Sequence, residues 1–267
     1  MTQPSVSLDP HPPDGRTIRL DLEYDGTDFV GWQIQARGRS IQGELHRALG
    51  QLLREEVMPV GSGRTDAGTH ALGQVAHFHT TSGLPPERLA RALNSLLPPD
   101  IAVTACSEAS GDFHARYSAL SKRYRYRIAT AKPALDRRFV WTLYRSLDLQ
   151  RLNDAAGALS GTHQFAAFCK QDPVPERFDC RILDCCWYRQ GLELVFEVEA
   201  NRFLRHMVRI LVGTMVEVGL GQRPGSCLPE LLAPCEGASE ARERRASAGP
   251  TAPATGLCLL RVVYPEE

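Results

Sequence analysis

The feature that most constrains the fold is an unbroken alternation of apolar and polar residues from Arg16 to Asp25. Ile18, Leu20 and Leu22 fall on one side of this stretch, and charged residues fall between them. Such alternation is typical of a strand that buries one face. Several later strand-like stretches follow one another too closely for a crossover helix. We therefore expect an α/β (α+β) fold, with a mixed, largely antiparallel sheet flanked by helices.

Helical and strand-like patterns alternate along the rest of the chain. Ser40 can cap a helix that runs to about Arg54, and Pro86 opens a second helix that Pro98 and Pro99 end. Strands are predicted at 74–80, 101–106, 122–128, 181–189, 192–200 and 257–264, and further helices at 148–159, 202–218 and 228–232.

This order of elements predicts two similar halves, 16–110 and 111–267, after a disordered tail at 1–15. Residues 236–253 are rich in Ala, Ser, Gly, Pro and Arg, and we expect them to form a mobile segment.

Composition limits the classes of function. The 267 residues carry 31 basic and 31 acidic side chains, so any binding of nucleic acid must use a local basic patch. No apolar run reaches the roughly 20 residues of a membrane span, and the first residues do not resemble an export signal. Eight cysteines without a C-x-x-C pair then indicate reduced thiols that pack in the protein.

The glycine-rich stretch from Gly61 to Gly68 is the first candidate site. Glycines allow tight turns and the close approach of a ligand, and Arg64 and Asp66 stand two positions apart within it. The alternative is a structural turn in which these two side chains pair at the surface. A phosphate-binding loop is disfavoured because no Gly-Lys-Ser/Thr ending follows.

The stretch from Lys122 to Ile128 is the second candidate. Strand alternation places Arg123, Arg125 and Arg127 on one face and Tyr124 on the other. Like charges in a row call for an anion, which phosphates would supply, and the tyrosine could stack on an unpaired base. A solvated arginine face is the alternative.

The third candidate is a basic stripe, in which Arg202, Arg205 and Arg209 recur at helical spacing. The apolar residues around Arg209 indicate that it is partly covered and needs a carboxylate partner. His70, His77 and His79 could in principle bind a metal together with Asp66, although histidines two apart in a strand are more often structural.

Taken together, these segments resemble the TruA family of tRNA pseudouridine synthases. The stretches that carry the resemblance are Glu23-Tyr24-Asp25-Gly26, Gly31-Trp32-Gln33, Gly63-Arg64-Thr65-Asp66-Ala67-Gly68 with His70, Phe113-His114-Ala115-Arg116, Arg123-Tyr124-Arg125-Tyr126, His206-Met207-Val208-Arg209 and Gly256-Leu257. They occur in the family's order across residues 16–264.

The resemblance implies a pseudouridine synthase fold and isomerisation of uridines 38–40 in the tRNA anticodon stem-loop. It further implies a cytoplasmic homodimer that works without metal or organic cofactor. Asp66 matches the family's nucleophile, Arg64 its base-displacing arginine, Tyr124 its active-site tyrosine and Arg209 the arginine that pairs with the aspartate. Arg123, Arg125, Arg202 and Arg205 are expected to contact the RNA.

The chemistry of such an isomerisation agrees with these residue types. A guanidinium beside a carboxylate favours its ionised form, and Arg64 could fill the gap that an everted base leaves. Tyr124 could stack on the displaced base or help to remove its C5 proton. Two other functions remain open from the residues alone, a non-catalytic RNA-binding module and a histidine-based, metal-dependent nuclease or phosphatase.

Overall fold

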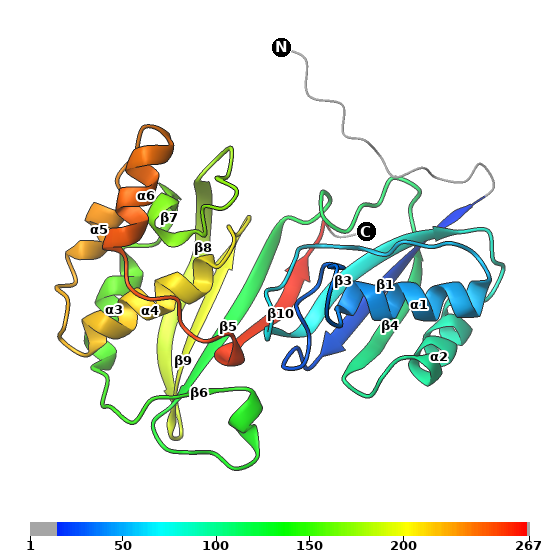
Figure 1. The fold of residues 1–267 in the computed structure, drawn as a ribbon, viewed down its shortest axis with the longest axis horizontal. Helices are drawn as coiled ribbons and strands as arrows, with labels where there is room; N and C mark the ends of the chain where they lie inside the picture. Colours follow the sequence, from blue (N-terminus) through cyan, green and yellow to red (C-terminus); the bar gives the residue numbers. More distant parts are fainter. Residues whose placement is uncertain (1–14, 266–267) are drawn as a thin grey trace.

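The computed structural model of the protein describes residues 15–265. Its framework is one ten-stranded sheet in the order β4-β1-β3-β10-β5-β9-β8-β7, with β2 paired to β3 and β6 paired to β5 (Figure 1). The strands are β1 (Arg16–Tyr24), β2 (Val60–Gly61), β3 (His70–Thr80), β4 (Ile101–Ala109), β5 (Ser121–Ala129), β6 (Trp141–Thr142), β7 (Gly161–Gln164), β8 (Asp179–Gln190), β9 (Glu193–Ala200) and β10 (Leu257–Val263). Within the described chain only β3–β10 and β5–β6 pair in parallel, which confirms the mixed, largely antiparallel sheet.

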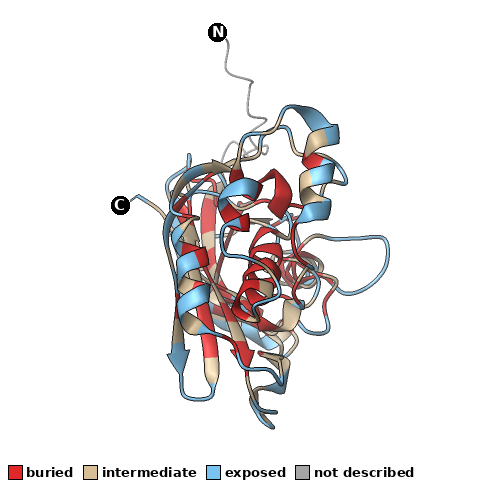
Figure 2. Ribbon diagram, turned by 90° about the vertical axis from the view of Figure 1, so that its left-hand side faces the viewer, coloured by how far each residue is buried: buried red, intermediate tan, exposed pale blue. Residues whose placement is uncertain are grey.

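Six α-helices flank this sheet: α1 (Ile41–Leu53), α2 (Pro86–Leu96), α3 (Leu149–Gly157), α4 (Met207–Gly219), α5 (Cys227–Leu232) and α6 (Gly237–Ser247), in the part of the chain that the structure describes. As predicted, Ser40 caps α1, its side chain accepting a hydrogen bond from the backbone N–H of Gly43. Figure 2 shows that buried residues gather where the helices meet the strands, while the outward helix faces are exposed. None of the described helices is long and apolar enough to cross a membrane.

The closing strand β10 joins the two halves of the sequence. It pairs in parallel with β3 of the first half and antiparallel with β5 of the second half. In Figure 1 it lies at the centre of the sheet, with α1 and α2 on one side and α3 to α6 on the other. The last strand of the chain therefore makes one continuous sheet of the two halves.

Helix α4 begins later than predicted. The apolar spacing predicted a helix from 202, but the helix starts at Met207, after His206 in a left-handed conformation with φ 64°. A left-handed residue interrupts an α-helix, and the carbonyl of Arg205 accepts a hydrogen bond from the backbone of Lys170 instead. Arg202 and Arg205 therefore lie outside the helix, and the predicted helical stripe with Arg209 does not form.

The segment 236–253 also differs from expectation, because it contains helix α6 where no regular structure was predicted. Arg244 donates hydrogen bonds to the carbonyls of Glu230, Ala233 and Pro234, which fasten α6 to the end of α5. Ala241 is fully buried, so even this polar helix has one packed position. The predicted disordered tail, apart from Gly15, lies outside the described residues.

Candidate active site

Asp66 lies on the loop from Ser62 to Thr69, which connects β2 to β3. A second loop, after β1, fixes the backbone of this one: the N–H of Trp32 donates to the carbonyl of Thr65 at 3.1 Å, and the N–H of Gly68 donates to that of Phe29 at 3.3 Å. Gly31 makes the contact possible. Its φ is 104°, and a Cβ atom there would stand 2.6 Å from the carbonyl oxygen of Thr65.

Beneath the loop lies a buried network of polar side chains. The Tyr24 hydroxyl and the Thr65 hydroxyl are 2.8 Å apart, and the amide of Gln74 donates to the carbonyl of Gly63 at 3.0 Å. The Ser62 hydroxyl donates to the side-chain oxygen of Gln74 at 2.8 Å. Buried polar groups that are paired in this way hold one geometry, so the network fixes the residues that precede Asp66 in the loop.

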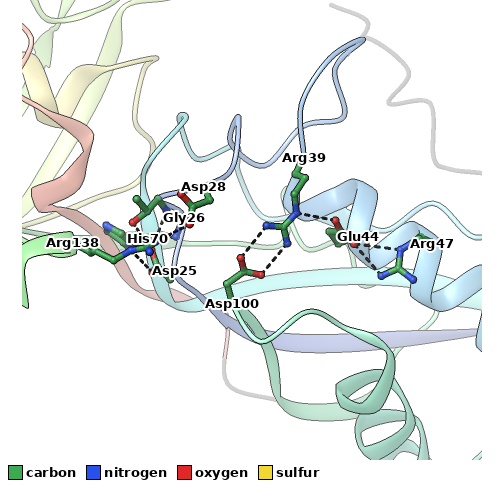
Figure 3. A network of polar contacts seen from close by, with 10 residues as sticks. Asp25, Gly26, Asp28, Arg39, Glu44, Arg47, His70, Asp100 and Arg138 are labelled. Carbon is green, nitrogen blue, oxygen red and sulfur yellow. Dashed lines mark hydrogen bonds and ion pairs between the residues drawn. The ribbon is translucent and has the colours of Figure 1, made fainter. Parts of the chain in front are cut away.

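A further network anchors the loop where it enters β3 (Figure 3). The ring nitrogen Nδ1 of His70 accepts a hydrogen bond from the N–H of Gly26 at 3.1 Å and lies 3.2 Å from a carboxylate oxygen of Asp25. Arg138 pairs with the other oxygen of Asp25 at 3.1 Å. Burial lowers the pKa of His70, although the charge of Asp25 opposes this shift. His70 therefore holds the turn after β1 against the start of β3.

The partners of Asp66 come from the second half of the chain. Arg209 Nη1 lies 3.5 Å from one carboxylate oxygen, and His206 Nε2 lies 3.6 Å from the other. Arg209 is itself fixed, because its Nε donates to the carbonyl of Ala252 at 2.8 Å. The Asp66 side chain remains 21% exposed, so the carboxylate is held between two nitrogen groups and still open to a ligand. The predicted pairing of Asp66 with Arg209 is present in the structure.

His206 was absent from the site predicted from sequence, although it belongs to the stretch that ends in Arg209. Burial lowers its pKa below the usual range; the charge of Asp66 opposes this shift, and Arg209, Arg205 and Lys170 reinforce it. The lowered pKa favours the neutral ring at neutral pH, and its Nε2 lies beside the Asp66 carboxylate at 3.6 Å, beyond hydrogen-bonding distance. The signal available in the sequence was its position three residues before Arg209. Residues with that spacing at the start of a helix lie close together.

Tyr124 approaches the same site from β5. Its ring is 8% exposed and packs edge-to-face on Phe203 at 5.0 Å between ring centroids. Burial raises the pKa of Tyr124 above its usual range, with the charges of Tyr24 and Asp66 adding to the shift. The hydroxyl therefore stays protonated at neutral pH, which makes Tyr124 a poor base in the free protein. Stacking and hydrogen-bond donation are the roles that its environment favours.

Arg64 lies on the same loop as Asp66 and is exposed. Among the described residues it forms no hydrogen bond or ion pair. The two side chains do not pair with each other, and the guanidinium beside the carboxylate is that of Arg209. This excludes the alternative of a surface Arg64–Asp66 pair and leaves the guanidinium available to a ligand.

The charges on the arginine face of β5 were predicted to be neutralised by phosphates, but in the structure they are neutralised by carboxylates of the protein itself. Arg123 pairs with Asp184, Glu197 and Glu199, and Arg125 pairs with Glu197. The carboxylates come from β8 and from the neighbouring β9, so the row of like charges needs no phosphate. Because side chains alternate across a strand, this face is turned away from Tyr124. The argument that made Arg123 and Arg125 RNA contacts therefore fails.

Arg202 and Arg205 are both exposed in the segment before α4. Arg205 donates to the carbonyl of Asp172 at 2.9 Å and is close enough to His206 to affect its pKa. The charge of Arg202 acts instead on the thiol of Cys180, in β8. Of the two, Arg205 is the one near the candidate site.

The three histidines predicted as candidate metal ligands, His70, His77 and His79, do not assemble with Asp66 as a metal site would require. His77 is buried beside His79 and His114, and its Nδ1 accepts a hydrogen bond from the N–H of Ala115 at 3.2 Å. Across residues 15–265 the structure brings together no group of three or more His, Cys, Asp or Glu side chains that could hold a metal ion.

Comparison with known proteins identifies the family. A family model described as tRNA pseudouridine synthase matches residues 22–118 and 155–265. A protein from Moorella thermoacetica named tRNA pseudouridine synthase A is 43% identical over 251 residues, which are 92% of this chain and 99% of that protein. The chain belongs to the tRNA pseudouridine synthase A (TruA) family.

Other members of the TruA family match over a similar length. Proteins of the same name from Chlorobium luteolum and Myxococcus xanthus are 42% and 43% identical, and the matches cover 94% and 92% of this chain and 97% and 91% of theirs. A solved dye-decolorizing protein from V. cholerae aligns with a TM-score of 0.19 at 13% identity, too weak a likeness to bear on the fold.

The family assignment confirms the resemblance inferred from the motifs, and with it that the chain is an enzyme, a tRNA pseudouridine synthase and hence an isomerase. The matched ranges contain the Asp66 loop, α4 and β10. They leave out residues 119–154, and so β5 with Tyr124.

Proposed function

We propose that the protein isomerises uridine to pseudouridine at positions 38–40 of the tRNA anticodon stem-loop, with Asp66 as the nucleophile. The observation that carries the proposal is the placement of a partly exposed Asp66 carboxylate between Arg209 and His206, at the junction of the two halves. Membership of the TruA family supplies the substrate class, and the motif resemblance supplies the positions.

The reaction needs three changes on one uridine. The N1–C1′ bond breaks, the uracil turns, and a C5–C1′ bond forms; the proton leaves C5, and N1 ends protonated. Atoms balance without any added reagent. The carboxylate of Asp66 attacks either C1′ or C6 and is released again within the cycle; the isomerisation is complete when the carboxylate has departed and C5 has lost its proton. Arg209 lies 3.5 Å from the carboxylate and orients it toward the ligand.

The other residues of the site would bind the everted base and the RNA around it. An everted uridine costs a few kcal/mol of lost stacking, and the unpaired guanidinium of Arg64 would offset part of it by filling the vacated space. Tyr124 would stack on the base or donate a hydrogen bond, since burial keeps its hydroxyl protonated. Arg205, exposed beside His206, is the predicted RNA contact that the geometry still favours over Arg202.

The decisive experiment replaces Asp66 by Asn, which keeps the shape of the side chain and removes its charge. Wild-type protein should release tritium from C5-labelled uridine in an unmodified tRNA transcript, and nucleoside mapping should place the product at 38–40. Asp66→Asn should lower the rate by on the order of 10³-fold or more while tRNA binding persists. Asp112→Asn, an exposed change in another loop, serves as the matched control.

Three results would count against the proposal. Turnover in Asp66→Asn near the wild-type rate would end the nucleophile assignment. A product outside 38–40 would correct the site of modification. Binding of tRNA by wild-type protein without any product would favour the non-catalytic RNA-binding module.

Two features of the proposal rest on the resemblance alone. We propose that the enzyme works as a homodimer and that it acts in the cytoplasm. Sedimentation equilibrium at micromolar concentration should give twice the 29.5 kDa mass of one chain. Fractionation of cells should recover the protein with the cytosolic tRNA-modifying activity.

A further inference from the structure

Lys122 lies on the active-site side of β5. It stands two positions before Tyr124, so strand alternation gives both side chains the same face and turns Arg123 to the other. In the sheet it lies between Ala200 of β9 and Val262 of β10, near the middle of the molecule. The residue took no part in the site predicted from sequence.

The ammonium group of Lys122 reaches the loop that carries Arg64 and Asp66. Its Nζ lies 3.2 Å from the point where a Cβ atom on Gly63 would project. Gly63 directly precedes Arg64, and its carbonyl is held by Gln74. The lysine therefore ends beside the backbone of the active-site loop, at a position that the absence of a side chain on Gly63 keeps open.

No carboxylate pairs with the ammonium group of Lys122 within residues 15–265. Lys122 forms no ion pair there, in contrast to its neighbours Arg123, Arg125 and Arg127, which all pair with acidic side chains. The charged side chain that acts on it is Arg116, a second cation that is exposed and without a carboxylate partner in the same residues. Burial and Arg116 together lower the pKa of Lys122 to about 8.

A covered lysine beside another cation destabilises the free protein unless an anion binds there. The ligand class already argued for this site is RNA, whose backbone presents phosphates. We propose that Lys122 binds a backbone phosphate of the RNA strand beside the everted uridine, with Arg116 adding to the attraction. This inference rests on the proposed function, because it takes RNA as the ligand of the site.

The test is the salt dependence of binding to an unmodified tRNA transcript, measured by filter binding between 50 and 200 mM salt. Each phosphate contact contributes roughly 0.7–0.9 to the slope of log K against log salt. Lys122→Gln should lower the slope by about that amount, and Lys122→Arg should keep it. Lys132→Gln, at an exposed lysine elsewhere, should leave slope and activity unchanged.

A second measurement remains useful if the glutamine variant fails to fold. Arg116, the charged group facing Lys122, does not titrate near pH 8, so wild-type affinity should fall between pH 7 and 9 as Lys122 loses its proton. Lys122→Arg should lose this part of the pH dependence. A wild-type slope in folded Lys122→Gln, or the same fall of affinity in Lys122→Arg, would overturn the inference.

The two proposals fail in different ways. Wild-type protein that makes no pseudouridine would refute the proposed function, whatever the salt slopes are. Wild-type protein that makes pseudouridine, combined with an unchanged slope in Lys122→Gln, would refute only the role of Lys122.

Discussion

Replacement of Gly31 by Ala should slow catalysis through the backbone of the Asp66 loop without touching the reacting groups. The new Cβ atom would stand 2.6 Å from the carbonyl oxygen of Thr65 and 3.1 Å from the carbonyl carbon of Asp66. Ordinary van der Waals contact begins near 3.4 Å, so the two loops must separate by roughly 0.8 Å. A φ of 104° adds strain of about 1–3 kcal/mol for any residue with a side chain.

The displaced backbone carries Asp66, the proposed nucleophile. Asp66 follows Thr65 directly, and its contacts with Arg209 and His206 are already 3.5 and 3.6 Å long. A misplacement near 1 Å costs on the order of 10²-fold in rate. We therefore expect Gly31→Ala to lower the single-turnover rate of pseudouridine formation by about 10²-fold, with tRNA affinity changed much less.

The assay compares single-turnover rates at saturating enzyme with dissociation constants for the same transcript. Gly83→Ala is the matched control, because a Cβ atom at Gly83 has no other atom within 4 Å. Circular dichroism establishes that both variants are folded. A folded Gly31→Ala enzyme with the wild-type rate would refute the reasoning that this contact sets the position of Asp66.

The other predictions concern the site and the sheet behind it. Arg209→Ala should lower turnover by about 10²-fold or more, and a variant at the wild-type rate would remove Arg209 from the site. Tyr24→Phe should cost about 1–3 kcal/mol of stability, because it takes a buried partner from Thr65 and Gln74, whereas Tyr144→Phe on the exposed surface should cost nothing measurable in thermal denaturation. Burial raises the pKa of Glu199, but hydrogen bonds from Ser121, Arg123 and Arg261 outweigh burial and lower the pKa to about 2. The ionised Glu199 therefore stabilises the folded protein above pH 4.5, and this contribution is lost as the pH falls toward 2. Denaturant titrations should show that Glu199→Gln lowers the free energy of unfolding by about 1–3 kcal/mol at neutral pH. Between pH 4.5 and 2 the stability of this variant should depend less on pH than that of the wild type. Parallel curves of stability against pH for the two proteins would contradict this. Excess chelator should leave turnover unchanged, and lost activity that a divalent metal restores would instead favour the metal-dependent alternative.

Local patterns in the sequence determined most of the elements. The alternation in β1, the cap at Ser40 and the proline at the start of α2 act through neighbouring residues, so they could be interpreted without knowledge of the rest of the chain. The Asp66 loop was found for a similar reason, because its glycines and charges stand together in the sequence. The family resemblance then connected this loop to Arg209, a partner 143 positions away.

Tertiary structure decided what the charges do. The sequence shows a row of arginines on β5 but not the glutamates of β9 that face them, because cross-strand pairs lie far apart along the chain. It shows helical spacing from Arg202 to Arg209 but not the left-handed turn at His206, since the hydrogen bond that diverts the backbone comes from Lys170. The sequence did not indicate Lys122 for the same reason, because the role of this lysine depends on which charged side chains the fold places beside it. Spacing along a chain fixes local conformation, whereas the electrostatic role of a side chain depends on distances that only packing sets.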